Sequence, residues 1–135
     1  MDATPAELAA VPLFASLGEP ELREIASWFD AKDVGEGARL IGEGASGYTF
    51  FVLVDGAAVV TAGGEEVGTL GAGDFFGEIA ILGDGRRSAT VTTTAPSRVL
   101  VMFGTEFRRL QQSRPEIGSR IESTMGERVA HALTD

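Results

Sequence analysis

The feature of this chain that most constrains its fold is a series of short apolar segments separated by glycines. Fourteen of the 18 glycines lie between Gly35 and Gly85. Glycine at this density marks turns and bulges, because it adopts positive φ without a steric penalty. The segments between the glycines are rich in β-branched and aromatic residues and have strand length: 48–54, 57–61, 66–70, 89–94 and 98–103. Many short strands with frequent turns indicate an antiparallel sandwich or barrel.

Two dipeptides predict how neighbouring strands are joined. Asp55-Gly56 lies between the first two segments, and Gly63-Gly64 lies between the second and the third. Both pairs favour the positive φ values that a two-residue hairpin turn needs. We therefore expect a β-hairpin at each of these two positions.

The first 29 residues carry helix signals. Thr4, Pro5 and Glu7 form a capping-box pattern with proline at the first helical position, which predicts a short helix to about Ala10. A second helix is expected over 19–29, where apolar residues recur at helical spacing: Leu22, Ile25, Ala26 and Phe29.

Helix signals return after the last strand. Thr105 is expected to cap one helix, and Ser113 opens a second capping-box pattern that ends at Glu116. Beyond it, apolar residues recur every four positions and form one stripe on one helix: Ile117, Ile121, Met125, Val129 and Leu133.

Composition excludes several classes of function. The chain has no cysteine and a single histidine, His131, which excludes disulfide frameworks, thiolate zinc sites and metal sites with several histidines. A cupin-like metalloenzyme is disfavoured for the same reason. The formal charge of −9 disfavours binding to nucleic acid and to anionic membranes.

The location of the protein is also indicated by its sequence. No segment approaches the roughly 18 apolar residues of a membrane span, and the N-terminus has neither a basic region nor an apolar signal core. We therefore expect a cytoplasmic protein. Ten of the 11 basic residues are arginine, which is typical of a GC-rich bacterial genome.

The segment 75–91 carries the chemistry that a ligand would need. Gly77 precedes about one turn of helix-forming residues, 78–82, and the unpaired N–H groups at a helix N-terminus attract anions. Arg87 and Ser88 follow, and a guanidinium donates two parallel hydrogen bonds to a phosphate. Arg86 is expected to face solvent, because neighbouring side chains of an extended segment face opposite sides. The segment therefore predicts an anion-binding cradle.

Residues 75–91 resemble the phosphate-binding cassette of the cyclic nucleotide-binding domain family. That family includes the catabolite activator protein, regulatory subunits of the cAMP-dependent kinase and cyclic-nucleotide-gated channels. The pattern F-G-E-hydrophobic-A-hydrophobic stands at 76–81, and R-small-A-x-V stands at 87–91. The opening helix motif of the family resembles residues 11–17, and its early hairpin turn resembles residues 42–47.

The resemblance implies one α+β domain over residues 1–135. N-terminal helices would occupy 1–29, and an antiparallel, jelly-roll-like β-roll would occupy 30–103. The cassette, 75–91, would insert a short phosphate-binding helix between strands. Hinge and lid helices would occupy 104–135.

The resemblance also implies the binding residues. Arg87 would grip the cyclic phosphate, and Glu78 would accept a hydrogen bond from the ribose 2′-hydroxyl. The backbone amides from Gly77 through Ile79 and Ala80, together with the Ser88 hydroxyl, would contact phosphate oxygens. Further contacts, chiefly apolar ones with the base and ribose, would come from Val67, Leu70, Phe75, Phe76 and Ala89. Arg128 would stack on the purine from the last helix, with Leu133 as a second choice for that position.

The expected function is that of a non-catalytic sensor whose C-terminal helix closes over its ligand. The ligand would be cAMP, with cGMP weaker, because Ser88 occupies a position where the family has serine or alanine in cAMP binders and threonine in cGMP binders. No cofactor or metal is expected.

Other interpretations stay open. The chain is alternatively an N-terminal regulatory fragment of a larger cAMP-dependent transcription factor, channel or enzyme. A plain Glu78–Arg87 salt bridge or a family member that has lost nucleotide binding would also fit these residues. The protein effector is unknown, no nucleic acid or membrane partner is expected, and the stripe 117–133 suits either a monomer or a homodimer.

Overall fold

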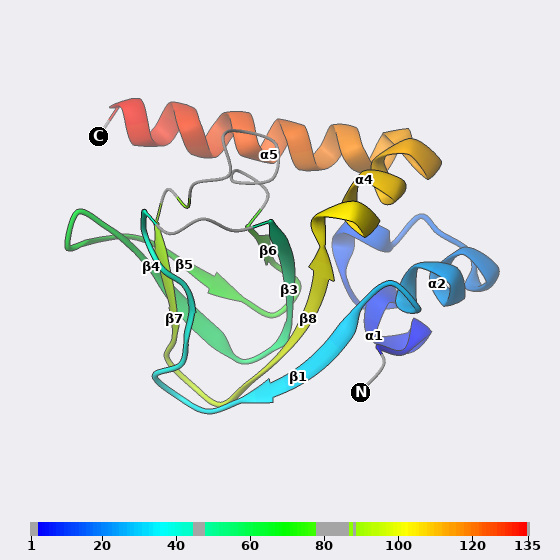
Figure 1. Ribbon diagram of the computed structural model, residues 1–135, viewed down its shortest axis with the longest axis horizontal. Coiled ribbons are helices and arrows are strands. Elements are labelled where there is room, and N and C mark those ends of the chain that lie inside the picture. The colour runs from blue at the N-terminus through cyan, green and yellow to red at the C-terminus, as the bar shows by residue number, and fades with distance from the viewer. Residues whose placement is uncertain (1–2, 45–47, 78–86, 88, 135) are drawn as a thin grey trace.

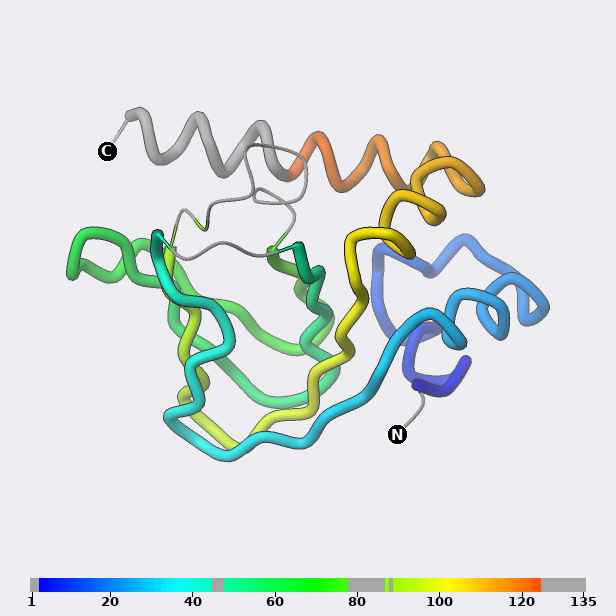
Figure 2. The backbone as a smooth tube through the Cα atoms, in the orientation of Figure 1, coloured from blue at the N-terminus to red at the C-terminus, as the bar shows by residue number. Residues whose placement is uncertain are grey.

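The computed structural model describes residues 3–44, 48–77, 87 and 89–134, with side chains through Thr124 (Figure 2). The chain folds as an antiparallel β-roll with helices at both ends (Figure 1). The strands are β1 (Asp30–Val34), β2 (Arg39–Ile41), β3 (Thr49–Asp55), β4 (Ala57–Ala62), β5 (Glu65–Gly71), β6 (Phe75–Phe76), β7 (Thr90–Thr93) and β8 (Ser97–Phe103). They form two sheets, with strand orders β1-β8-β3-β6 and β2-β7-β4-β5.

All five segments that were expected to be strands are strands, within one or two residues at each end. The additional strands β1, β2 and β6 were not individually predicted. β1 has the sequence Asp-Ala-Lys-Asp-Val, of which only Ala31 is buried, so it lacks an apolar pattern. Its position is set by pairing with β8 along its whole length.

The hairpin expected at Gly63-Gly64 is confirmed. Strands β4 and β5 pair with Ala62 opposite Glu65, which leaves the two glycines as the turn. Their φ values are 61° and 82°, as a turn with two left-handed residues requires.

The hairpin expected at Asp55-Gly56 is wrong. Strand β3 pairs with β6 and β8, whereas β4 pairs with β5 and β7, so the dipeptide carries the chain from one sheet to the other. Gly56 has a φ of 105°, and a Cβ placed there would lie 2.8 Å from the Pro96 carbonyl oxygen and 2.7 Å from the Ser97 Cβ. The positive φ of Gly56 therefore lets the chain change direction between the two sheets, where it packs against the segment that connects β7 to β8.

Two apolar cores lie on opposite faces of the first sheet. Along β3, Phe50 and Val52 face the helices, whereas Phe51 and Leu53 face the interior of the roll. Alternation along a strand produces this division. Because both faces are covered, β3 carries the nearly unbroken apolar run that its sequence shows.

The N-terminal helices cover the outer face of this sheet (Figure 1). Helix α1 (Pro5–Ala9) begins with the predicted capping box between Thr4 and Glu7. The short 3-10 helix η1 (Pro12–Phe14) and helix α2 (Glu19–Ala26) follow. Helix α2 ends three residues before the predicted boundary, although Phe29 is still buried in the core shared with the sheet.

The C-terminal helices are α4 (Gly104–Ser113) and α5 (Pro115–Thr134). The predicted cap at Thr105 is wrong, because the N-cap of α4 is Phe103, two residues earlier. The Thr105 hydroxyl donates to Glu106 instead. Ser113 ends α4 rather than capping α5, which starts with Pro115 in its first turn. Ile117 and Ile121 of the predicted stripe are fully buried; the side chains of Met125, Val129 and Leu133 lie outside the described residues.

An ion pair between distant segments fastens α1 to the sheet. The Arg98 Nε of β8 donates to Glu7 Oε2 at 2.6 Å, and its Nη1 lies 3.2 Å from Asp33 Oδ1 of β1. The Glu7 side chain is 16% exposed, and its hydrogen bond with Arg98 holds the pKa of that carboxyl below its usual value of 4.5.

Replacing Glu7 by glutamine should lower the melting temperature at pH 7. Glutamine keeps the capping-box geometry but removes the charge that pairs with Arg98. Because the folded pKa of Glu7 is lowered, its stabilisation is present above about pH 4.5 and is lost as the pH falls through the folded value. Thermal denaturation should therefore show a difference between wild type and Glu7→Gln that shrinks below pH 4.5. Glu19→Gln, in an exposed pair with Arg23, is the control and should change little; a difference that is independent of pH would contradict this account.

Gly56→Ala should lower the free energy of unfolding by about 1–3 kcal/mol or more, since it combines strained backbone with overlap at Pro96 and Ser97. Gly35→Ala is the matched control, because a Cβ there meets no described atom within 4 Å. Urea denaturation of both variants tests this. Equal stability of the two variants would show that the corner does not require glycine.

Candidate functional site

The side chain of Arg87 is buried where the two sheets meet. It is 8% exposed. Its Nη1 donates to the carbonyl oxygens of Thr49 and Gly77, both at 3.2 Å, and its Nη2 donates to the Thr49 carbonyl at 3.2 Å. Thr49 begins β3 and Gly77 follows β6 in one sheet, whereas Arg87 precedes β7 in the other. The guanidinium therefore joins the ends of three strands.

Gly77 has the backbone conformation and the space that this contact requires. Its φ is 94°, which disfavours any side chain. A Cβ there would lie 2.5 Å from the Thr49 carbonyl oxygen, 3.2 Å from Arg87 Nη1 and 3.4 Å from a ring carbon of Phe51. The sequence analysis expected Gly77 to allow close approach at the start of the phosphate-binding helix. In the structure, Gly77 allows the close approach of the Arg87 guanidinium.

The turn after β2 is tied to the same place. The amide of Gly44 donates to the Arg87 carbonyl at 2.9 Å, and the amide of Glu43 donates to the Thr90 hydroxyl at 3.0 Å. Glu43 Oε1 in turn accepts a hydrogen bond from the amide of Gly63, at the tip of the β4–β5 hairpin. These contacts link the turn after β2 to the backbone of Arg87 and to the β4–β5 hairpin.

The guanidinium of Arg87 is a charged group held inside the fold. A buried guanidinium is stabilised here by carbonyl dipoles, which carry no net charge. Interactions between charges are stronger in a buried site than in water, because the effective dielectric constant is lower. The hydrogen bonds to Thr49 and Gly77 therefore hold the guanidinium in one orientation next to Gly77, the last described residue before the segment for which anion binding is predicted.

Some of the predicted apolar contacts line the interior of the roll. Leu70 and Phe76 are 9% and 3% exposed and belong to the inner core, where Phe76 stacks on Phe51 with ring centroids 4.9 Å apart. Ala89, two residues after Arg87, is half-buried. Val67 is 42% exposed on β5, so it does not belong to the inner core.

Phe75 is not brought together with these residues. It packs against the core between the sheet and the helices, with its ring centroid 5.6 Å from that of Phe50. Successive side chains of a strand point to opposite faces, so Phe75 and Phe76 cannot both face the interior. Phe75 therefore lies on the opposite face of the strand from Phe76, and its contact with the base or ribose stays a prediction.

Several predicted site residues lie outside the described part of the chain. They are Glu78, Ile79, Ala80 and Ser88, with the side chains of Arg128 and Leu133. The short helix predicted over 78–82 also lies there.

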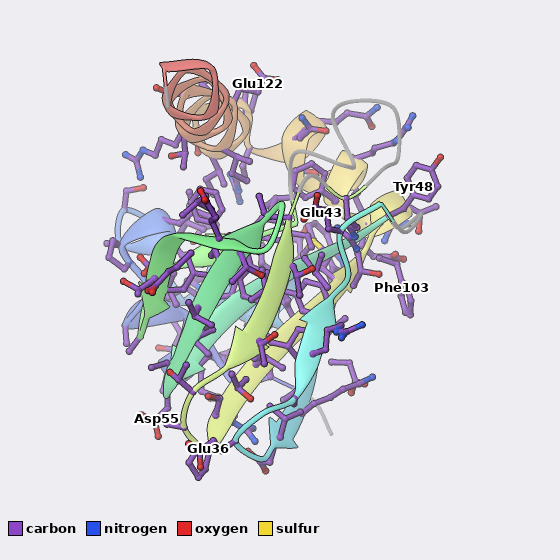
Figure 3. All side chains as sticks on the ribbon, turned by 90° about the vertical axis from the view of Figure 1, so that its left-hand side faces the viewer. Glu36, Glu43, Tyr48, Asp55, Phe103 and Glu122 are labelled. Carbon is purple, nitrogen blue, oxygen red and sulfur yellow. The ribbon has the colours of Figure 1, made fainter. Side chains whose placement is uncertain are left out.

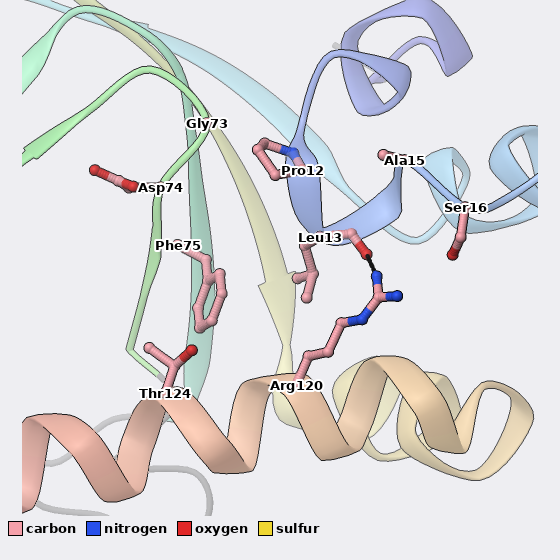
Figure 4. A pocket seen from close by; sticks show the side chains of 9 residues that line it. All are labelled: Pro12, Leu13, Ala15, Ser16, Gly73, Asp74, Phe75, Arg120 and Thr124. Carbon is pink, nitrogen blue, oxygen red and sulfur yellow. Dashed lines mark hydrogen bonds between the residues drawn. The ribbon is translucent and has the colours of Figure 1, made fainter.

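A pocket lies between η1, the turn before β6 and α5 (Figure 4). Its lining comes from η1, from the turn before β6 and from α5: Pro12, Leu13, Ala15, Ser16, Gly73, Asp74, Phe75, Arg120 and Thr124. Arg120 crosses it to donate to the Leu13 carbonyl at 3.4 Å. Of the predicted site residues that the structure describes, Phe75 is the one that lines it.

Sequence reasoning missed the carbonyl oxygens of Thr49 and Gly77, because a backbone acceptor leaves no signal in residue type. It also missed two exposed aromatic residues, Tyr48 and Phe103, which are 56% and 67% exposed and lie at one edge of the molecule (Figure 3). Among the described helices, none is long and apolar enough to cross a membrane.

Comparisons with known proteins agree with this geometry. A family model for the cyclic nucleotide-binding domain matches residues 31–114. A cyclic nucleotide-gated potassium channel of Rhizobium etli is 38% identical over 121 residues, which are 90% of this chain and 34% of the channel. The chain thus spans about a third of that relative's length.

Solved structures give the same result. The regulatory domain of Toxoplasma gondii PKA, crystallised with cAMP, superposes with a TM-score of 0.77 at 26% identity, over 89% of this chain and 48% of that one. The catabolite activator protein of Thermus thermophilus superposes with a TM-score of 0.79 at 24% identity, over 91% and 60%, and supports the fold. With the buried arginine, the glycine at positive φ and the roll that positions them, these matches show that the chain belongs to the cyclic nucleotide-binding domain family and is a regulatory domain of that type.

Proposed function

We propose that this chain is a non-catalytic receptor for a 3′,5′-cyclic nucleotide, with cAMP as the preferred ligand and cGMP as a weaker one. The observation that carries the proposal is the buried Arg87 guanidinium, fixed by the carbonyl oxygens of Thr49 and Gly77. No metal or cofactor takes part. A cytosolic location and a bacterial source, both expected from the sequence, stay part of the proposal.

The cyclic phosphate is assigned to Arg87. The ligand carries one negative charge, whereas the whole chain carries −9. At physiological salt the screening length is about 8 Å, so distant carboxylates act weakly and a guanidinium at contact distance dominates. Backbone amides from Gly77 onward would complete the phosphate contacts, as the matching motif implies.

Glu78 and Ser88 are proposed from the sequence motif. Glu78 would accept a hydrogen bond from the ribose 2′-hydroxyl, which is free in a 3′,5′-cyclic nucleotide. The hydroxyl of Ser88 would contact the phosphate. Because Glu78 carries a negative charge, it has to contact the sugar rather than the phosphate.

The signal is proposed to leave through α5. Its first turns are anchored by the fully buried Ile117 and Ile121, and Arg120 donates to the Leu13 carbonyl of η1. The later turns, which include Arg128, would close over the base and report occupancy to a protein effector. A ligand shifts such an equilibrium only by its difference in affinity for the two states.

This chain matches only part of the length of its relatives. The chain spans 34% of the Rhizobium etli channel and 48% of the Toxoplasma gondii kinase chain. The domain is therefore also consistent with the regulatory part of a larger channel, kinase subunit or transcription factor, as a monomer or a homodimer.

Arg87→Leu should weaken cAMP binding by about 100-fold or more, because it removes two charge-assisted hydrogen bonds of roughly 1.5–3 kcal/mol each. Isothermal titration calorimetry measures this directly. Arg86→Leu is the matched control, since it makes the same charge change one residue away and should keep binding within a few-fold. Glu78→Ala should weaken binding to an intermediate degree.

Two results would contradict the proposal. Wild-type protein that binds neither cAMP nor cGMP would remove the ligand class, and undiminished binding by Arg87→Leu would remove the role of the arginine. Since Arg87 also hydrogen-bonds the protein's own backbone, the fold of each variant is checked by circular dichroism before titration.

Gly77→Ala should abolish cAMP binding and lower stability, because a Cβ there meets the Thr49 carbonyl and Arg87 Nη1. Gly37→Ala separates this contact from backbone strain: Gly37 also has a positive φ, 82°, but a Cβ there meets no described atom within 4 Å. Thermal shifts with and without cAMP compare the two, since ligand at 100 times its dissociation constant stabilises by about 2.7 kcal/mol. A full ligand-induced shift in Gly77→Ala would refute the predicted role of the glycine.

A further inference from the structure

Helix α4 begins beside the strand that holds Arg87. Strand β8 runs into α4 without a loop, because β8 ends at Phe103 and α4 starts at Gly104 (Figure 1). Phe103 lies opposite Thr49 in the pairing of β8 with β3. Thr49 is a residue whose carbonyl oxygen accepts from the Arg87 guanidinium. The first turn of α4 therefore starts directly after the strand pair that carries this acceptor.

Gly104 and Tyr48 are in close contact at this point. A Cβ at Gly104 would lie 3.1 Å from the Tyr48 carbonyl oxygen and 3.2 Å from the Tyr48 Cβ. Both distances are shorter than the roughly 3.5–4.0 Å at which non-bonded carbon atoms pack best. A side chain at position 104 would therefore displace either the start of α4 or the backbone of Tyr48.

Local structure does not account for a glycine at position 104. The φ of Gly104 lies outside the left-handed region, so backbone conformation does not require it. Glycine is also a poorer helix former than alanine. Gly118 of α5 is different in its surroundings, because a Cβ there would meet Gln111 atoms at 3.5 Å, an ordinary packing distance. The close contact with Tyr48 therefore distinguishes Gly104 from Gly118.

The start of β3 is enclosed on both of its edges. Successive carbonyl groups of a strand point to opposite edges. The Tyr48 carbonyl lies against Gly104, whereas the Thr49 carbonyl lies against Gly77 and Arg87. A Cβ at Gly77 would lie 2.5 Å from the Thr49 carbonyl oxygen, so the backbones are already close on that edge. A displacement of Tyr48 away from α4 would therefore move the Thr49 carbonyl relative to the guanidinium.

We propose that Gly104 is a positioning residue for Arg87. Its missing side chain lets α4 begin directly against Tyr48. The next carbonyl along the chain, that of Thr49, is thereby kept where it accepts from both terminal nitrogens of the guanidinium. This inference rests on the proposed function and deepens it, because it makes the first turn of α4 a determinant of ligand affinity at Arg87.

The test compares Gly104→Ala with Gly118→Ala. Both variants replace a helical glycine by a better helix former, but the first brings its new Cβ against Tyr48. Each variant and the wild type are titrated calorimetrically with cAMP, and their stabilities are measured by urea denaturation. We expect Gly104→Ala to bind cAMP about tenfold more weakly than wild type, and Gly118→Ala to bind within about twofold of it. A change in stability of Gly104→Ala without a loss of affinity would show a merely structural role and overturn the inference.

A double-mutant cycle tests whether the effect passes through Arg87. Arg87→Lys keeps the positive charge but lacks the planar fork that can contact a carbonyl and a phosphate together. In the Arg87→Lys background, Gly104→Ala should weaken cAMP binding by about twofold or less, since the geometry that it disturbs is already lost. Additive losses of affinity would contradict the proposal, because Gly104 would then act on another part of the site.

The outcomes separate this inference from the function itself. Wild type that binds no cyclic nucleotide overturns both. Wild type that binds cAMP, together with a Gly104→Ala variant of equal affinity, overturns the role of Gly104 alone. If Gly104→Ala does not fold, the double variant Gly104→Ala/Tyr48→Gly replaces it, because the second substitution removes the Tyr48 Cβ. That double variant is compared with Tyr48→Gly alone, and equal cAMP affinities of the two would overturn the inference.

Discussion

The contact between one guanidinium and two backbone carbonyl oxygens organises the ligand-binding end of this protein. Arg87 leads into one sheet, whereas Thr49 and Gly77 belong to the ends of strands in the other. The contact therefore fixes how the sheets meet, and it depends on the absence of a side chain at Gly77. It also holds the guanidinium in one orientation, and under the proposed function this orientation reduces the ordering that binding has to supply.

Local pattern predicted most of the strands but not how they connect. Short apolar runs between glycines identify strands because one face or both faces must be buried. The dipeptides Asp55-Gly56 and Gly63-Gly64 carry the same turn signal, yet only the second forms a hairpin, because the first has to pass between sheets. β1 shows no apolar pattern of its own, and its place is set by pairing with β8. Which strands pair is decided by tertiary packing.

The candidate binding residues could be proposed from sequence to the extent that their chemistry depends on residue type. Gly77 and Arg87 could be proposed from the sequence, because few other residue types provide a bidentate cation or a backbone without a side chain. The carbonyl of Thr49 could not, since every residue has one. The faces of Phe75 and Phe76 could not be assigned from sequence either, because a two-residue strand offers no alternation to count.

A crystal structure of the protein with cAMP tests the central claim most directly. The account predicts the cyclic phosphate within hydrogen-bonding distance of the Arg87 guanidinium, with the amide of Gly77 beside it. The claim is contradicted if the nucleotide binds elsewhere on the molecule, or if its phosphate lies in the roll without contacting Arg87.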